Sequence, residues 1–188
     1  MREIEIKLRV RDLKALETRI QESGCVLSEP IHQHDVIYSL RGSSREFENA
    51  KKGDVIVRIR RQDNKAELNL KQQCSNEMDN LEYETEVKDP DATHQMLLLL
   101  GWRPSVEVKK IRRKGKIGSY EICLDRVEEL GDFVELENMT EDDADPNKVR
   151  EELFGVLESL GLSRQAEEIR GYDTQIFKLR HPNQNNPE

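Results

Sequence analysis

The stretch Met1–Val10, MREIEIKLRV, decides the fold because charged and apolar side chains alternate along it. In an extended strand, successive side chains point to opposite faces of the sheet. The charged residues therefore share one face, spaced about 6–7 Å apart along the strand, and these are Glu3, Glu5 and Lys7. The other face carries the aliphatic residues, which are Ile4, Ile6 and Leu8. A single strand of this kind also suits a solvated surface, so its meaning depends on the segments that follow.

Length and composition favour one folded domain. The chain has 188 residues, enough to bury a core. Charged residues make up 36% and hydrophobic residues 35%, but the apolar positions recur regularly, which is typical of a folded chain. The net charge of −8 argues against general nucleic-acid binding, which needs a basic face. A local basic cluster could still bind a small anion.

The cysteines and the apolar runs indicate the compartment. Three cysteines, Cys25, Cys74 and Cys123, are widely spaced and form no Cys-x-x-Cys pair, so we expect reduced thiols. No apolar run approaches the roughly 18–20 residues that a membrane span needs, and the N-terminus lacks the apolar core of a signal peptide. We therefore expect a cytoplasmic protein without a membrane partner.

Capping residues and glycines predict the helices. An aspartate cap at the start and a glycine at the end predict three of them, over 12–24, 89–101 and 145–161. A short fourth helix is expected around Tyr172–Lys178. From His181 onward the chain has no apolar periodicity. We expect a single domain over 1–180 and a disordered tail over 181–188.

The alternation seen at the N-terminus returns in seven further segments, over 32–40, 54–61, 66–72, 81–88, 102–114, 119–127 and 132–138. Short turns join most of them, which predicts hairpins. The fold class is therefore α+β with a largely antiparallel sheet, and eight strands are enough to close a barrel. Residues 41–53 mix glycine, serine and charges, and form either a plain connection or a lid over a site.

The charged strand faces have two possible explanations. They meet solvent if the sheet is a simple layer, or they line an interior if the sheet curls. A charged interior is costly unless water and ligands pair its groups. A polyanion with divalent cations meets that demand, because lysine and arginine bind phosphate oxygens and carboxylates bind Mg²⁺ or Mn²⁺. Composition alone leaves both explanations open.

The ordered set of charged residues resembles the CYTH superfamily of triphosphate tunnel metalloenzymes, which includes class IV adenylyl cyclases and thiamine triphosphatases. The opening Glu3-Ile4-Glu5-Ile6-Lys7 is similar to the family's E-x-E-x-K signature. The rest follows in the family's order to about residue 175, as Arg58-x-Arg60, Lys71, the Glu-rich strand over 82–86, Lys110-x-Arg112, Asp125 and Leu130-Gly131-Asp132-Phe133-x-Glu135-x-Glu137. The resemblance implies a closed eight-stranded antiparallel β-barrel, a triphosphate tunnel, with helices packed outside.

The resemblance also implies roles for residues. The residues implied to hold Mg²⁺ or Mn²⁺ are Glu3, Glu5, Asp125, Glu135 and Glu137. Those implied to bind the triphosphate are Lys7, Arg58, Arg60, Lys71, Lys110 and Arg112. Those implied to be catalytic are Glu5, Lys7, Asp125 and Glu135. Two further candidates are Glu84, chosen from its strand, and Arg170, as a charge from the C-terminal helix.

The resemblance leaves two reactions open for a small-molecule triphosphate such as ATP, thiamine triphosphate or tripolyphosphate. The chain length, the Leu-Gly-Asp-Phe stretch and Tyr172 look closest to the class IV adenylyl cyclases, which form cyclic AMP and pyrophosphate from ATP. Gly115 stands where a tyrosine commonly follows the Lys-x-Arg strand, and Glu137 is retained where some cyclases lack it. The second departure favours a triphosphatase. A non-catalytic binding module, an acidic interaction protein and a homodimeric assembly also remain open.

Overall fold

The computed structural model describes residues 2–40 and 51–182. Most of the predicted loop or lid over 41–53 lies outside the described residues, because these resume at residue 51. The predicted disordered tail also lies outside them from residue 183 onward.

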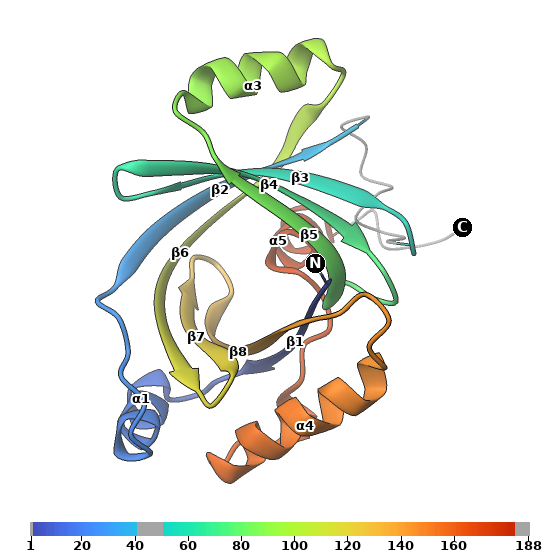
Figure 1. Ribbon diagram of the computed structural model, residues 1–188. Helices are drawn as coiled ribbons and strands as arrows, with labels where there is room; N and C mark the ends of the chain where they lie inside the picture. The colour runs from blue at the N-terminus through green and yellow to red at the C-terminus, as the bar shows by residue number, and fades with distance from the viewer. Residues whose placement is uncertain (1, 41–50, 183–188) are drawn as a thin grey trace.

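Eight antiparallel strands form a closed barrel, as predicted (Figure 1). Their order around the barrel is β1-β5-β4-β3-β2-β6-β7-β8. Strands that follow each other along the chain are mostly neighbours, which is the hairpin connection that the short turns predict. The strands are β1 (Arg2–Arg9), β2 (Ile31–Ser39), β3 (Val55–Gln62), β4 (Lys65–Gln73), β5 (Asp79–Glu86), β6 (Arg103–Ile117), β7 (Tyr120–Val127) and β8 (Gly131–Thr140).

The helices pack outside the barrel or across its end. The described helices are α1 (Leu13–Glu22), α3 (Pro90–Leu99), α4 (Pro146–Ser159) and α5 (Tyr172–Arg180), and a short 3₁₀ turn spans Arg164–Ala166. In Figure 1, α1 and α4 lie on one side of the barrel and α3 lies on the opposite side. Asp12, Asp89 and Asp145 accept backbone hydrogen bonds at the helix starts, which confirms the capping signals. In the described ranges, no helix has both the length and the apolar character to cross a membrane.

The alternation in β1 sorts its side chains between the core and the barrel interior. Ile4, Ile6 and Leu8 are fully buried in one hydrophobic cluster with residues of α1 and α4 such as Leu16 and Leu153. The charged residues of β1 consequently point to the interior. This packing confirms that the charged faces line an interior and rules out the simple layer with wet faces.

The segment before α5 completes the wall beside β1. β1 pairs with β8 over Arg2–Arg9 but with β5 only over Arg2–Ile4. Beyond that point the Glu168 backbone N–H donates to the Lys7 carbonyl oxygen at 2.9 Å. The chain then enters α5, whose Tyr172 packs against the inward-facing Phe133 of β8. One end of the barrel is therefore closed by apolar side chains.

Candidate active site

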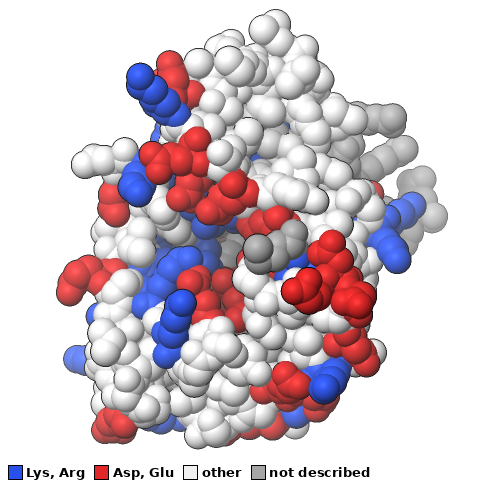
Figure 2. All heavy atoms as spheres, viewed as in Figure 1, with Lys and Arg blue, Asp and Glu red and all other residues white. Residues whose placement is uncertain are grey.

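The inward faces of the strands enclose a charged cavity of about 1050 Å³. Figure 2 shows basic side chains inside the hollow and acidic side chains around it. Most of the residues that the sequence predicted for the site line this cavity. They are Glu3, Glu5, Lys7, Arg58, Arg60, Lys71, Glu84, Lys110, Arg112, Glu135 and Glu137. Asp125 and Arg170 are not among the lining residues.

Three carboxylates of β1 and β8 converge, and we call Glu5, Glu135 and Glu137 the acidic group. Their carboxylate oxygens lie within 4.8 Å of one another. The strand register explains this, because Glu5 is paired with Glu137 and Lys7 with Glu135. Burial and the nearby carboxylate of Glu135 raise the pKa of Glu5 to about 7. Crowded carboxylate oxygens with a titrating member suit a hard divalent cation, so the donor set fits Mg²⁺ or Mn²⁺.

Lys7 and Arg112 form ion pairs with the carboxylates of the acidic group. Lys7 Nζ lies 3.4 Å from Glu135 Oε1 and 4.0 Å from Glu5 Oε1. Arg112 forms ion pairs with both Glu135 and Glu137. Burial alone would raise the pKa of Glu135, but Arg112 and Lys7 hold it well below its usual range. Glu135 therefore stays ionised.

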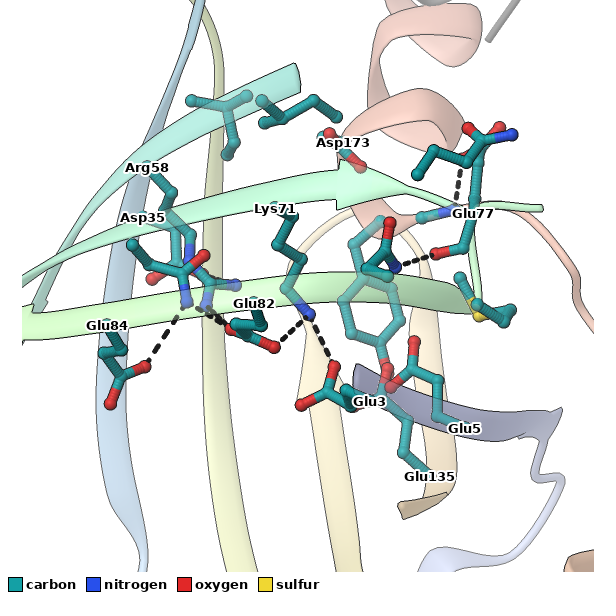
Figure 3. Close-up of a pocket in the computed structure, with 18 of the residues that line it drawn as sticks. Glu3, Glu5, Asp35, Arg58, Lys71, Glu77, Glu82, Glu84, Glu135 and Asp173 are labelled. Atoms are coloured by element: carbon teal, nitrogen blue, oxygen red, sulfur yellow. Dashed lines mark hydrogen bonds and ion pairs between the residues drawn. The ribbon is translucent and has the colours of Figure 1, made fainter. Parts of the chain in front are cut away.

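Glu3 lies apart from the acidic group. Figure 3 shows Lys71 between Glu3 and Glu82, and its Nζ lies 2.7 Å from Glu3 Oε1 and 3.1 Å from Glu82 Oε2. Burial would lower the pKa of Lys71, but these carboxylates raise it, so the ammonium stays charged. The structure thus gives Glu3 a lysine partner, and within the described ranges the convergent carboxylates do not include it.

Inside the cavity, β5 contributes the carboxylate of Glu82 to ion pairs with Arg58 and Lys71. Its Oε1 lies 3.7 Å from Arg58 Nη2 and accepts a hydrogen bond from Asn69. Glu84, the candidate chosen from the sequence, lines the cavity but is exposed. Its Oε2 accepts only a long hydrogen bond, of 3.5 Å, from Asn69 Nδ2. The strand was identified correctly, and the more enclosed position is two residues earlier.

Asp125 lies behind the basic side chains, and its side chain is fully buried. It accepts hydrogen bonds from Arg112 Nε at 2.7 Å, from Arg112 Nη2 at 2.6 Å and from Lys110 Nζ at 3.1 Å. Burial would raise the pKa of Asp125, but Arg112 and Lys110 lower it. The structure therefore brings Asp125 to the basic residues, and does not bring it to the acidic group with which the sequence grouped it.

Arg170 is placed differently from the prediction. It precedes α5, and its side chain is 44% exposed. Its guanidinium donates to Glu168 at 2.7 Å through Nε and through Nη2. Only its carbonyl oxygen reaches the site, where it lies 3.2 Å from Lys7 Nζ. In this structure the Arg170 guanidinium is paired with Glu168, so a charge from Arg170 in the site stays a prediction.

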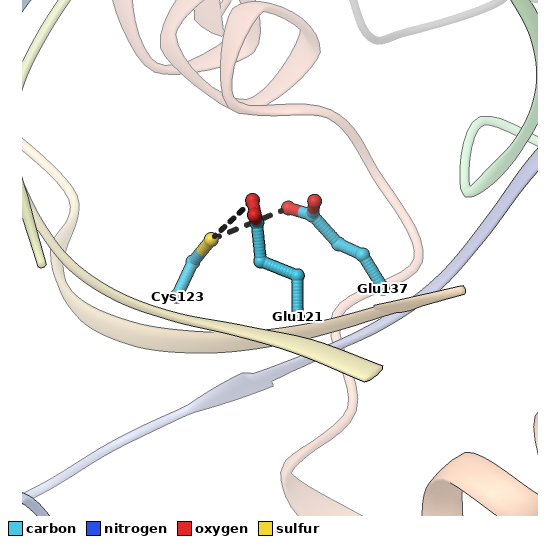
Figure 4. Close-up of side chains that lie close together, drawn as sticks. All are labelled: Glu121, Cys123 and Glu137. Carbon is cyan, nitrogen blue, oxygen red and sulfur yellow. Dashed lines mark hydrogen bonds between the residues drawn. The ribbon is translucent and has the colours of Figure 1, made fainter. Parts of the chain in front are cut away.

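A thiol and two carboxylates meet beside the acidic group (Figure 4). Cys123 Sγ lies 3.5 Å from Glu137 Oε1 and 3.7 Å from Glu121 Oε1. Burial raises the pKa of Cys123 well above its usual value, so the thiol is neutral. This arrangement agrees with the interpretation of Cys123 as a small neutral filler.

The sequence did not predict several charged residues that line the cavity, among them Asp35 of β2 and Glu121 of β7. Asp35 of β2 accepts two hydrogen bonds from Arg60, each 2.8 Å long. Glu121 of β7 forms an ion pair with Lys114 at 2.6 Å. The only available signal was alternation, which places Asp35 on the same face as Gln33 and Ile37.

Comparison with known proteins supports the resemblance. The CYTH domain matches residues 1–172. A Methanocaldococcus jannaschii protein named "Putative adenylate cyclase MJ0240" is 29% identical over 166 residues, which are 87% of this chain and 92% of that protein. The Aeromonas hydrophila protein named "Adenylate cyclase CyaB" is 35% identical over 88 residues, which are 47% of this chain and 46% of that protein.

A solved structure has the same fold. The PH1819 protein from Pyrococcus horikoshii OT3 superposes with a TM-score of 0.79 and 26% sequence identity, and the match covers 95% of this chain and 99% of that one. The domain match, which spans most of the chain, and the shared closed barrel lead to one conclusion. The chain belongs to the CYTH domain family.

Proposed function

We propose that the protein is a divalent-metal-dependent enzyme that acts on a triphosphate bound inside the barrel. One observation carries this proposal: the acidic group, Glu5, Glu135 and Glu137, shares one cavity with a set of buried basic side chains. Binding an anion alone needs no carboxylates near the phosphates, whereas metal-assisted phosphate chemistry needs both signs. This contrast favours an enzyme over a passive binding module.

The roles of the residues follow from their charge and position. Arg58, Arg60, Lys110 and Arg112 would bind phosphate oxygens and neutralise the charge that develops in the transition state. Glu5, Glu135 and Glu137 would hold Mg²⁺ or Mn²⁺, which supplies positive charge to the phosphates and activates the attacking oxygen. Burial raises the pKa of Glu5 to about 7 without a bound cation, and a divalent cation would favour its ionised form.

The first candidate reaction is the cyclisation of ATP. The names of the Methanocaldococcus jannaschii and Aeromonas hydrophila relatives support it. In this reaction the ATP 3′-hydroxyl attacks the α-phosphorus, the new phosphoester bond closes cyclic AMP, and pyrophosphate leaves. The basic residues would hold the leaving pyrophosphate.

The second candidate reaction is hydrolysis of the terminal phosphate of ATP, thiamine triphosphate or tripolyphosphate. Glu137 favours it, because this carboxylate completes the acidic group and stands at a position where some cyclases lack an acid. In this reaction, water attacks the terminal phosphorus, the bond from that phosphorus to the bridging oxygen breaks, the diphosphate part of the substrate leaves, and the attacked phosphoryl group becomes orthophosphate.

Product analysis separates the candidates. The purified protein is incubated with Mg²⁺ or Mn²⁺ and ATP, thiamine triphosphate or tripolyphosphate, and the products are identified. Cyclic AMP with pyrophosphate supports the cyclase, and orthophosphate without a cyclic product supports the triphosphatase. The absence of any turnover with all three substrates and both metals would overturn the proposal of an enzyme.

A further inference from the structure

Two buried aspartates each lie opposite an arginine of the site. In the strand register, Asp35 is paired with Arg60 across β2 and β3, and Asp125 is paired with Arg112 across β6 and β7. Each aspartate accepts one hydrogen bond from Nε and one from Nη2 of its arginine. Two parallel hydrogen bonds fix the plane of a guanidinium group, so the same device orients two arginines.

Asp35 is the less expected of the two, because it lines the cavity and carries the same sign of charge as a phosphate. Its side chain is only 4% exposed. Burial alone would raise the pKa of Asp35, but Arg60 and Arg58 hold it well below the usual range. An ionised carboxylate at this place repels an incoming anion. Asp35 can therefore favour anion binding only through its effect on the neighbouring arginines.

Arg58 differs from Arg60 in what its nitrogens contact. Arg58 Nη1 lies 3.6 Å from Asp35 Oδ2, and Nη2 lies 3.7 Å from Glu82 Oε1. Both distances exceed those of hydrogen bonds. Arg58 Nε is buried and has no hydrogen-bond partner in the part of the chain that the structure describes. A buried donor without an acceptor is unfavourable, and a phosphate oxygen would satisfy it.

We infer that Asp35 is a positioning residue of the triphosphate site. It keeps Arg60 fixed, and its charge holds Arg58 beside it with hydrogen-bond donors left for the ligand. Arg58 then donates to the triphosphate through Nε, while Arg60 keeps Nε and Nη2 on Asp35 and has Nη1 left for a phosphate oxygen. This inference rests on the proposed function, because it concerns how that site meets its ligand.

Calorimetric titration of tripolyphosphate into variants tests the role of Asp35. Asp35→Asn removes a negative charge, so an effect through electrostatic potential alone predicts tighter binding. Positioning predicts binding weakened by about tenfold or more, because small displacements of binding groups are costly. Asp35→Glu keeps the charge but moves the carboxylate, and positioning predicts that it also weakens binding. Affinity at or above the wild-type value in Asp35→Asn overturns the inference.

Asp132→Asn is the matched control. Asp132 accepts from Arg126 Nε at 2.9 Å and from Arg126 Nη2 at 3.2 Å, the same side-on geometry on the outer surface. This variant loses the same charge at a place far less buried, with Arg126 65% exposed. We expect it to bind tripolyphosphate with wild-type affinity.

A measurement on the wild-type protein covers the case in which the Asp35 variants fail to fold. The Nε–H resonances of Arg58 and Arg60 are followed by NMR and assigned with Arg58→Lys and Arg60→Lys. On addition of tripolyphosphate, the Arg58 resonance shifts and the Arg60 resonance keeps its position. A shift of the Arg60 resonance as large as that of Arg58 overturns the inference.

Tripolyphosphate binding by the wild type distinguishes a failure of the proposed function from a failure of the inference about Asp35. If the wild-type protein binds no tripolyphosphate with or without Mn²⁺, the proposed function fails and the inference falls with it. If the wild type binds it and Asp35→Asn binds equally well, only the inference fails.

Discussion

Arg58 and Arg112 both line the cavity, but only Arg112 belongs to a buried network of hydrogen bonds. Arg112 contacts Asp125, Glu135 and Glu137. Removing one partner from such a network leaves uncompensated buried charges. Arg58 lies 3.6 Å from Asp35 Oδ2 and 3.7 Å from Glu82 Oε1, so its removal takes away charge pairing but breaks neither of these contacts as a hydrogen bond.

Substitution of each arginine therefore distinguishes an effect on ligand binding from an effect on the free energy of unfolding. Arg58→Ala is expected to abolish turnover and to lower the free energy of unfolding by less than Arg112→Ala does. Arg112→Ala is expected to lower the free energy of unfolding by about 3–5 kcal/mol. Urea denaturation and a turnover assay on both variants check this. Full turnover in Arg58→Ala would contradict the assignment of the site.

The raised pKa of Glu5 predicts how the free energy of unfolding depends on pH. Its pKa is raised from 4.5 to about 7, so the folded protein binds this proton more tightly than the unfolded chain. The contribution of Glu5 to stability is therefore complete below pH 4.5 and is lost as the pH rises through 7.

Substitution of Glu5 removes this dependence. Without divalent metal, Glu5→Gln is expected to be more stable than the wild type at pH 8, by at most about 3 kcal/mol, and to differ little at pH 4.5. Denaturant unfolding in the presence of a chelator at the two pH values measures the difference. An equal difference at both pH values would show that Glu5 does not titrate in this range.

At the residue scale, the sequence predicted the composition of the cavity better than the contacts within it. Alternation correctly placed Glu3, Glu5 and Lys7 on one face of β1, because the period of a strand is a local property. It could not show that Asp125 pairs with Arg112, because cross-strand partners depend on the register of the closed barrel. Asp35 was missed for the same reason, since its arginine lies on another strand.

At the scale of elements, the strands and helices follow from local signals. Alternation predicted all eight strands, and aspartate caps with closing glycines predicted α1, α3 and α4. β6 is longer than predicted, extending from Arg103 to Ile117, because its hairpin with β7 continues to Tyr120. The segment that pairs with β1 through Glu168 and Lys7 has no periodic pattern, so alternation could not predict it.

Gly115 shows how one element restricts another. The segment after α1 crosses β6 at this point, where the Ser28 N–H donates to the Lys114 carbonyl oxygen at 2.7 Å. A Cβ atom at Gly115 would lie 2.6 Å from Cys25 Sγ and 3.0 Å from the Val26 carbonyl oxygen. The close approach of this segment explains why a tyrosine, expected from the resemblance, is absent here.

Gly115→Ala therefore tests this crossing. The new methyl group must displace the segment after α1, and we expect the free energy of unfolding to fall by about 1–3 kcal/mol. Gly155→Ala in α4 is a control, because a Cβ atom there meets nothing within 4 Å. Thermal unfolding of both variants measures the effect, and equal stability of Gly115→Ala and the wild type would contradict it.

At the scale of the whole molecule, the barrel collects charges of both signs around one cavity. Ligands that pair these charges bind the folded chain and not the unfolded chain. Tripolyphosphate with Mn²⁺ at 100 times its dissociation constant should therefore add about 2.7 kcal/mol to the free energy of unfolding. The same addition should stabilise Arg58→Ala much less. Equal stabilisation of the two proteins would place the ligand outside the cavity.

The most direct test of the account is a crystal structure of the protein with tripolyphosphate and Mn²⁺, using the anomalous signal of manganese to locate the ion. The account predicts tripolyphosphate inside the barrel with an oxygen on Arg58, and manganese beside Glu5, Glu135 and Glu137. Tripolyphosphate bound outside the barrel, or manganese away from these three carboxylates, would contradict it.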